Sequence, residues 1–231
     1  MQYDVVIRCK NEIEWLPRVI NSLTNQTKKP ANIILVDDAS TDGSPEYAAN
    51  HGCKVKIYDK KEFNYSYALN LGLRETVHEN VLILSAHCEL VTDSSVANME
   101  NILVKYNAAG VYGRQIPTVN SNAIDTRDLL TAFGREEIIF DKFPFFHNAF
   151  SFIQRSAWED VEFDEGCNGI EDRIWARDQA LLNRKIVYTP DAIVFHEHGL
   201  NQGASEQRAA RVCRALSKLH EDDIFQWPNL S

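Results

Sequence analysis

Short apolar runs alternate with segments of helical periodicity along the first 90 residues of the chain. Four apolar runs predict buried strands at residues 3–8, 31–40, 54–59 and 81–85. Apolar spacing and a capped turn between them predict helices at 11–26, 41–52 and 65–77, the third weakened by Gly72. This alternation, with short links, is typical of a parallel, doubly wound α/β sheet whose two faces are both covered.

The second half of the chain is less regular. Residues 110–118 predict a strand, and residues 148–161 predict a strand followed by a short helix. The polar stretch 119–127 has little periodicity, so no element is predicted there. Residues 185–199 predict two short strands broken by Pro190.

Two further helices are expected. One begins near Glu171, and four of its residues are expected to face inward: Ile170, Ile174, Ala180 and Leu181. The other is an amphipathic helix at 205–223.

Composition narrows the class of protein. The chain has 231 residues, 44% of them hydrophobic and 25% charged, which suits one large globular domain. A net charge of -9 disfavours a general nucleic-acid-binding face. The five cysteines form no CxxC pair, so neither a disulfide framework nor a structural zinc site is expected, and the reduced cytoplasm is the expected location. No signal peptide is recognised, and no apolar stretch reaches the ~18 residues of a membrane span.

Three predicted strands end in polar sequences that carry chemistry. RCKNE follows the first strand, VDDASTD the second and SAHCE the fourth. Ligands of doubly wound sheets bind beyond the carboxyl ends of the strands. We therefore expect these three ends to contribute to one site.

Seven motifs carry a family resemblance over roughly residues 4–198: DVVIRCKNE, IILVDDASTDGS, FNYSYALNLG, LILSAHCEL, VYGRQIP, NAFSFIQRSAWE and IEDRIWA. In this order they resemble the inverting family 2 glycosyltransferases of GT-A fold, and among these the bacterial rhamnosyltransferase-like enzymes. The resemblance implies transfer of a sugar from a UDP- or dTDP-linked donor to a hydroxyl of a glycan or lipid-linked acceptor in bacterial surface polysaccharide synthesis. It implies one GT-A domain at 1–203, with a nucleotide-binding half (1–90) and an acceptor and catalytic half (91–203), followed by a helix and tail at 204–231.

The resemblance assigns the donor nucleotide to the strand ends of the first half. Asp38, and after it Asp37, would accept the imide N–H of the base or ribose hydroxyls. An aspartate here can instead cap the STDGS turn, which is the role we prefer for Asp42. Lys10 could reach a phosphate as a point charge. The other residues expected on the donor side are Arg8, Asn11, Glu12, Ser85, Ala86, Arg114 and Gln115, although Glu12 equally suits a solvated helix N-terminus.

The metal position departs from the family. Family members normally end the fourth strand in Asp-x-Asp, which holds Mg²⁺ or Mn²⁺ against the diphosphate, whereas this chain has Ser-Ala-His at 85–87. An imidazole favours Mn²⁺ or a later metal. Glu89 and a late histidine, His196 or His198, could complete a site with His87. The alternative is that His87 hydrogen-bonds a diphosphate or a neighbouring loop and no metal is required.

The catalytic base falls on the IED motif. Inversion needs a carboxylate that takes the proton of the acceptor hydroxyl. The resemblance assigns this role to Asp172, with Glu171 in support. The competing interpretation is helix capping, because acidic residues are favoured in the first turn of any helix.

Acceptor contacts are less sharply indicated. Asn148 is a candidate for sugar hydroxyls, and Trp158 with the cluster at 143–146 for an apolar acceptor wall. Core packing is the preferred interpretation of these aromatic residues. Tyr65 and Asn70 match a motif that packs on the donor side, a structural role.

The last predicted helix carries Arg208, Arg211, Arg214 and Lys218 on one side. Residues 204–220 could therefore contact the inner face of a membrane peripherally, or pack on the domain with a solvated basic face. Two rival functions remain. The first is a non-catalytic nucleotide-sugar binding domain, which the missing Asp-x-Asp supports. The second is a nucleotidyltransferase, which is less favoured because such enzymes usually begin with a glycine-rich loop for a nucleoside triphosphate, whereas IRCKNE contains no glycine.

Overall fold

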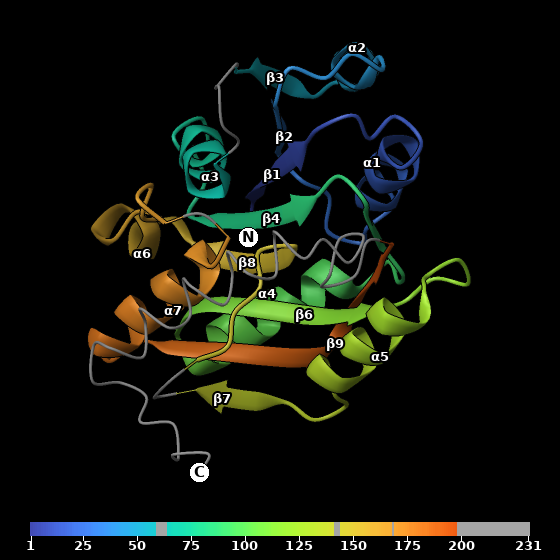
Figure 1. Cartoon of the computed structure of the whole chain (residues 1–231). Helices are drawn as coiled ribbons and strands as arrows, with labels where there is room; N and C mark the ends of the chain where they lie inside the picture. Colours follow the sequence, from blue (N-terminus) through green and yellow to red (C-terminus); the bar gives the residue numbers. More distant parts are fainter. Residues whose placement is uncertain (59–63, 141–143, 168, 198–231) are drawn as a thin grey trace.

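The structure is a computed structural model that describes residues 1–58, 64–140, 144–167 and 169–197 (Figure 1). Its strands are β1 (Tyr3–Cys9), β2 (Asn32–Asp37), β3 (Lys54–Ile57), β4 (Asn80–Ser85), β5 (Cys88–Leu90), β6 (Ala108–Ile116), β7 (Ile138–Phe140), β8 (Phe150–Gln154) and β9 (Lys185–His196). Its helices are α1 (Leu16–Thr24), α2 (Ser44–Asn50), α3 (Tyr65–Leu73), α4 (Ser95–Tyr106), α5 (Ala123–Ala132), α6 (Arg155–Asp160) and α7 (Glu171–Leu181).

All nine of these strands form a single sheet, in the order β3-β2-β1-β4-β8-β6-β9-β5, with β7 paired to β9. The first four strands are parallel, as the sequence predicts. The antiparallel strand β8 lies between β4 and β6, and β9 runs parallel to β6. The α/β class and the mainly parallel sheet are therefore confirmed.

Helices cover both faces of the sheet. One apolar cluster joins the sheet to α1, α2 and α4, and the other joins it to α3, α5, α6 and α7. Gly72 lets α3 approach closely, because a Cβ there would lie 2.4 Å from Val6 Cγ1 and 2.8 Å from Val36 Cγ2. The glycine that weakens the helix in isolation is thus a packing requirement.

Three sequence predictions about the second half are wrong. Helix α5 begins inside the polar stretch 119–127, where the Asn122 side chain caps it by accepting from Ile124 N and Asp125 N. Strand β9 continues through Pro190. Its pairing register with β6 shifts between Thr189 and Ile193, so Pro190, which has no N–H to donate, lies at an irregularity of the ladder and not at a paired position. The third prediction is wrong only in part: Ile170 is buried as expected and Ile174 and Ala180 are half-buried, but Leu181 is exposed. The fully buried positions of α7 after Glu171 are Trp175, Ala176 and Gln179.

The topology brings the polar strand ends together. Register pairs Cys9 with Asp37 and Arg8 with Ser85, so the carboxyl ends of β1, β2 and β4 share one edge. The helix predicted at 205–223 and the boundary near residue 203 lie outside the described residues.

Candidate functional site

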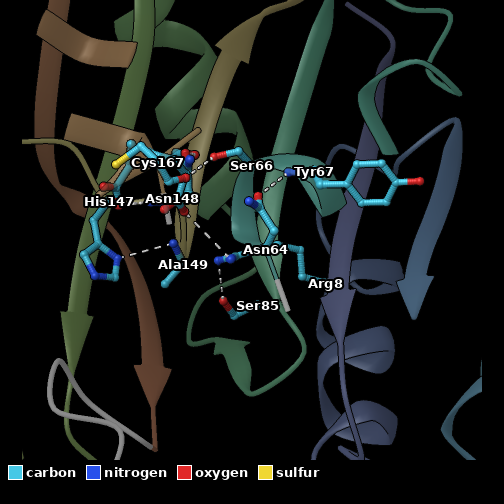
Figure 2. Close-up of polar contacts among 12 residues, drawn as sticks. Arg8, Asn64, Ser66, Tyr67, Ser85, His147, Asn148, Ala149 and Cys167 are labelled. Carbon is cyan, nitrogen blue, oxygen red and sulfur yellow. Dashed lines mark hydrogen bonds and ion pairs between the residues drawn. The ribbon is translucent and has the colours of Figure 1, made fainter. Parts of the chain in front are cut away.

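Arg8 connects the two halves of the molecule. Its Nη2 donates to Ser85 Oγ at 3.4 Å (Figure 2), and its Nη1 lies 3.9 Å from Glu171 Oε1. Its guanidinium carbon stands 4.9 Å from the centre of the Tyr65 ring, within cation–π range. The arginine thus links the end of β1 to β4, α3 and the start of α7.

Two adjacent carboxylates begin helix α7. Glu171 is 4% exposed, and burial raises its pKa to about 7, with a further rise from the charge of Asp172 and an opposing effect of Arg8. Asp172 is half-buried; its Oδ2 accepts from Asn148 N at 3.3 Å and its Oδ1 from Arg173 N at 2.8 Å. Of the two, Asp172 is the more accessible carboxylate.

Asn148 lies beside Asp172 and is 1% exposed. Its Oδ1 accepts from Ser151 Oγ at 3.0 Å, while its Nδ2 has no hydrogen-bond partner among the described residues. A buried amide donor without a protein partner is costly unless a ligand or water satisfies it. This geometry is compatible with the expected contact to a sugar hydroxyl.

The loop before α7 is held by polar residues of α3. Asn64 caps α3 by accepting from Tyr67 N at 2.9 Å, and Ser66 Oγ donates to Cys167 O at 3.0 Å (Figure 2). Asn64 Nδ2 also donates to Glu165 O at 2.9 Å. These contacts fix the segment that leads into Glu171.

Asn70, 1% exposed, is the most connected of these α3 residues. Its Nδ2 donates to Phe163 O at 2.8 Å and to Glu165 Oε1 at 3.2 Å, and its Oδ1 accepts from Trp158 Nε1 at 3.0 Å and Phe163 N at 3.2 Å. Trp158 is 3% exposed and belongs to the core, so it does not form part of an acceptor wall. The structural interpretation of Asn70 is confirmed.

The aspartates after β2 have different environments. Asp37 is fully buried and accepts from Ser40 N at 2.8 Å and Ser40 Oγ at 2.6 Å, which are turn contacts. Asp38 is 4% exposed and pairs with Lys10 Nζ at 2.5 Å. Asp42 accepts from Ile13 N at 2.9 Å and Ser44 N at 3.0 Å, as expected of a turn residue.

Asn11 shapes the first loop. It has a φ of 53° and accepts from Thr41 N at 2.8 Å through Oδ1, while its own N donates to Ser40 Oγ at 2.7 Å. Asparagine tolerates this left-handed conformation better than most residues. The loops after β1 and β2 are thereby joined at the edge where Lys10 and Asp38 lie.

A histidine cluster lies at the end of β4. The His87 and His196 rings stack at 5.2 Å between centroids with 11° between planes. His87, Cys88 and His196 each offer a possible ligand atom, all within 4.8 Å of one another. Cys88 faces His196 in the β5–β9 ladder, and burial raises the pKa of its thiol well above the ordinary range.

The polar partners of the two rings come from other strands and loops. Glu12 Oε1 lies 2.8 Å from His87 Nδ1, and Gln115 Oε1 lies 2.7 Å from His196 Nδ1. Gln115 was expected on the donor side as a direct contact, but it is fully buried between His196 and His147. His147 and Cys88 were missed; their signal in the sequence was adjacency to Asn148 and His87.

Of the residues that the structure describes, the remaining ones expected at the site do not contribute ligand atoms to the histidine cluster. The Glu89 carboxylate pairs with Arg18 Nη2 at 2.5 Å, and the structure does not bring it to the histidines. Arg114 is half-buried near Tyr188, whose pKa burial raises to about 12 against the opposing charge of Arg114. Ala86 is fully buried between Ser85 and His87. His198 and Phe143 lie outside the described residues.

Comparison with known proteins identifies the class. Residues 4–162 match the family described as Glycosyl transferase family 2. Since this match covers more than half of the chain, the protein belongs to glycosyl transferase family 2 and is a glycosyltransferase. Family membership therefore favours a glycosyltransferase over the two alternatives, a nucleotidyltransferase and a non-catalytic binding domain.

The relatives include O-antigen chain rhamnosyltransferases. RfbN of Salmonella typhimurium is 24% identical over 90% of this chain, and WbaN of Salmonella anatum is 24% identical over 84%. The chain spans 70% and 64% of the lengths of these two proteins.

Solved structures support the GT-A fold. A mannosyltransferase of Pyrobaculum calidifontis, solved with GDP-Man and Mn²⁺, has a TM-score of 0.70 and 18% identity, covering 98% of this chain and 65% of that one. S. aureus TarS with UDP-GlcNAc has a TM-score of 0.63 and 15% identity, covering 97% of this chain and 70% of that one.

Among the described residues, no helix is long and apolar enough to cross a membrane.

Proposed function

We propose that the protein is an inverting glycosyltransferase that moves a sugar from a UDP- or dTDP-linked donor to a hydroxyl of a glycan or lipid-linked acceptor in bacterial surface polysaccharide synthesis. Family membership and the two O-antigen rhamnosyltransferase relatives support the reaction class and the pathway. The observation that carries the proposal is the pair Glu171 and Asp172 at the start of α7, next to Arg8 and Asn148.

The donor nucleotide would bind at the edge formed by Lys10, Asp38 and Arg8. Asp38 supplies a carboxylate for the imide N–H of a pyrimidine or for ribose hydroxyls, and Lys10 supplies a mobile positive charge. Arg8 is 11% exposed in its side chain and lies beside Ser85, where it can face the diphosphate. Asp37 would then act by holding the turn that carries Asp38.

The acceptor proton would go to Asp172. Its carboxylate is held by two backbone N–H donors, which fix its direction, and it is the more accessible of the two acids. Asn148 next to it offers an amide donor to a sugar hydroxyl. Glu171 would support the site by balancing the charge of Arg8 rather than by touching the acceptor.

A divalent metal is expected from the family, and the residues at the end of β4 fit one. His87 and His196 supply two imidazoles that meet ring to ring, a donor set that suits Mn²⁺ or a later metal better than Mg²⁺. Such an ion, when bound, neutralises charge on the departing nucleoside diphosphate. Glu12 and Gln115 hold the far sides of the two rings.

Thermal unfolding with a panel of nucleotides tests the function. A ligand that binds the folded state raises the apparent stability by mass action, so UDP or dTDP should raise Tm and ATP should not. Asp38→Asn should reduce that rise. Release of the nucleoside diphosphate from a UDP- or dTDP-sugar, measured with Mn²⁺ and with EDTA, then tests turnover. No rise and no release with any donor would contradict the proposal.

A further inference from the structure

A chain of hydrogen bonds begins at a backbone amide near the site. Ala149 N donates to His147 Nδ1 at 3.3 Å (Figure 2). A backbone N–H can only donate, so His147 Nδ1 must be the acceptor. The proton of the neutral His147 ring therefore sits on Nε2.

The side-chain amide of Gln115 lies between His147 and His196, so the tautomer of His147 determines that of His196. Its Nε2 lies 3.1 Å from His147 Nδ1, and its Oε1 lies 2.7 Å from His196 Nδ1. The reverse orientation of the amide would place two acceptors against each other at His147. Because the amide oxygen faces His196, the proton of His196 belongs on Nδ1 and the lone pair on Nε2.

Glu12 imposes the same state on the facing ring. A carboxylate only accepts, and Glu12 Oε1 lies 2.8 Å from His87 Nδ1. The proton of His87 therefore also belongs on Nδ1. The backbone of Glu12 is itself held, since its N donates to Ser44 Oγ at 3.0 Å.

We propose that Glu12 and Gln115 are positioning residues that fix His87 and His196 with Nδ1 protonated, so that Nε2 of both stacked rings is kept as the ligand atom for a divalent metal ion. This inference rests on the metal site of the proposed function. An acceptor behind a metal-binding imidazole sets its tautomer and orientation, and its loss typically costs about 10–100-fold in metal affinity.

The proton positions can be measured without any metal. Long-range ¹H–¹⁵N correlation spectra of ¹⁵N-labelled, chelator-treated wild-type protein report which ring nitrogen of each histidine carries the proton. We expect Nδ1–H for His87 and His196, and Nε2–H for His147. Loss of one ring's signals in each of His87→Asn, His147→Asn and His196→Asn assigns the spectra.

Co²⁺ titration followed by visible absorption measures the consequence for binding. Gln115→Leu removes the acceptor behind His196, and we expect the affinity for Co²⁺ to fall about 10–100-fold. Gln115→Glu keeps an acceptor behind His196 but sets its other carboxylate oxygen against the acceptor Nδ1 of His147, so its affinity for Co²⁺ should lie between those of wild type and Gln115→Leu. Gln179→Leu is the matched control, because Gln179 is also fully buried but bonds to Ala157 O and Arg184, away from the cluster.

The outcomes separate the two ideas. A wild-type protein that binds no Co²⁺ contradicts the metal site itself. A His196 ring with its proton on Nε2, or Co²⁺ binding by wild type that Gln115→Leu leaves unchanged, overturns the positioning role while the metal site stands. The wild-type spectra decide the tautomers even if a Gln115 variant fails to fold.

Discussion

Arg8 Nη1 lies 3.9 Å from Glu171 Oε1, which joins the end of β1 to the first residue of α7 across 163 positions of sequence. Glu171 is nearly inaccessible, and a carboxylate in such a place is stable as an anion only with compensating charge. One arginine at this distance compensates incompletely, because burial still raises the pKa of Glu171 to about 7.

Glu171 should make stability depend on pH in a defined direction. Its folded pKa of about 7 lies above the ordinary 4.5, so its protonated form stabilises the fold below pH ~4.5 and this contribution is lost as pH rises to ~7. The contribution is on the order of 3 kcal/mol at most. Glu171→Gln should remove this fall in the free energy of unfolding, measured by urea denaturation at several pH values from 4.5 to 8. A variant whose stability falls with pH as steeply as the wild type would contradict the assignment.

Asp172→Asn should abolish transfer while donor binding stays nearly intact. General-base catalysis contributes about 10²–10⁴-fold, and the amide cannot take the proton of the acceptor hydroxyl. Transfer rate and nucleotide-induced Tm shift are measured on the same preparation. Asp178→Asn is the control, because Asp178 lies on the same helix and pairs with Arg177 at 2.8 Å. Activity of Asp172→Asn within a few-fold of wild type would contradict the assignment of Asp172 as the general base.

Asn70→Ala should lower both stability and turnover. The change leaves Trp158 Nε1 and Phe163 O in the core without their partner, at about 1–3 kcal/mol for each buried group. The same bonds hold the loop into α7, so kcat should fall more than the KM for the donor rises. Urea denaturation and steady-state kinetics check the two effects.

Asn98→Ala is the matched control for Asn70→Ala. Its Nδ2 donates to Asp191 O at 2.8 Å in an exposed contact, so the change should cost no more than about 0.5 kcal/mol. Equal effects of the two variants on turnover would remove the positioning role of Asn70.

Local patterns predicted the first half of the fold well. The buried strands β1, β2 and β4 are continuous apolar runs, and α1 buries the periodic positions Leu16 and Leu23. Helix α5 escaped detection because only Asp125 and Leu129 on it are buried, so it shows no apolar stripe. The continuity of β9 depends on a register shift against β6, a property of two strands together.

The candidate site was predicted in its residue types but not in its partners. The strand ends pointed to His87 and Asp38 as candidates, and the family resemblance pointed to Asp172. Sequence alone could not reveal that Glu12 lies behind His87 or Gln115 behind His196, because these contacts span 75 and 81 positions and follow from packing. The prediction that Glu89 is a metal ligand was wrong for the same reason, because its carboxylate forms an ion pair with Arg18 of α1 and the sequence does not show that contact.

Gly72→Ala sets helix propensity against packing. Alanine in an exposed helix interior would gain about 1 kcal/mol over glycine. At this position its Cβ would meet Val6 Cγ1 at 2.4 Å and Val36 Cγ2 at 2.8 Å, and both valines are stiff, buried strand residues. Overpacking costs about 1–3 kcal/mol, so a net loss of stability is expected, measured by urea denaturation. Gly134→Ala is the control, because a Cβ there meets nothing within 4 Å. Since α3 carries Asn64, Ser66 and Asn70, a shift of the helix away from the sheet should also lower transfer activity; a stabilised Gly72→Ala variant would show that α3 does not need this close approach.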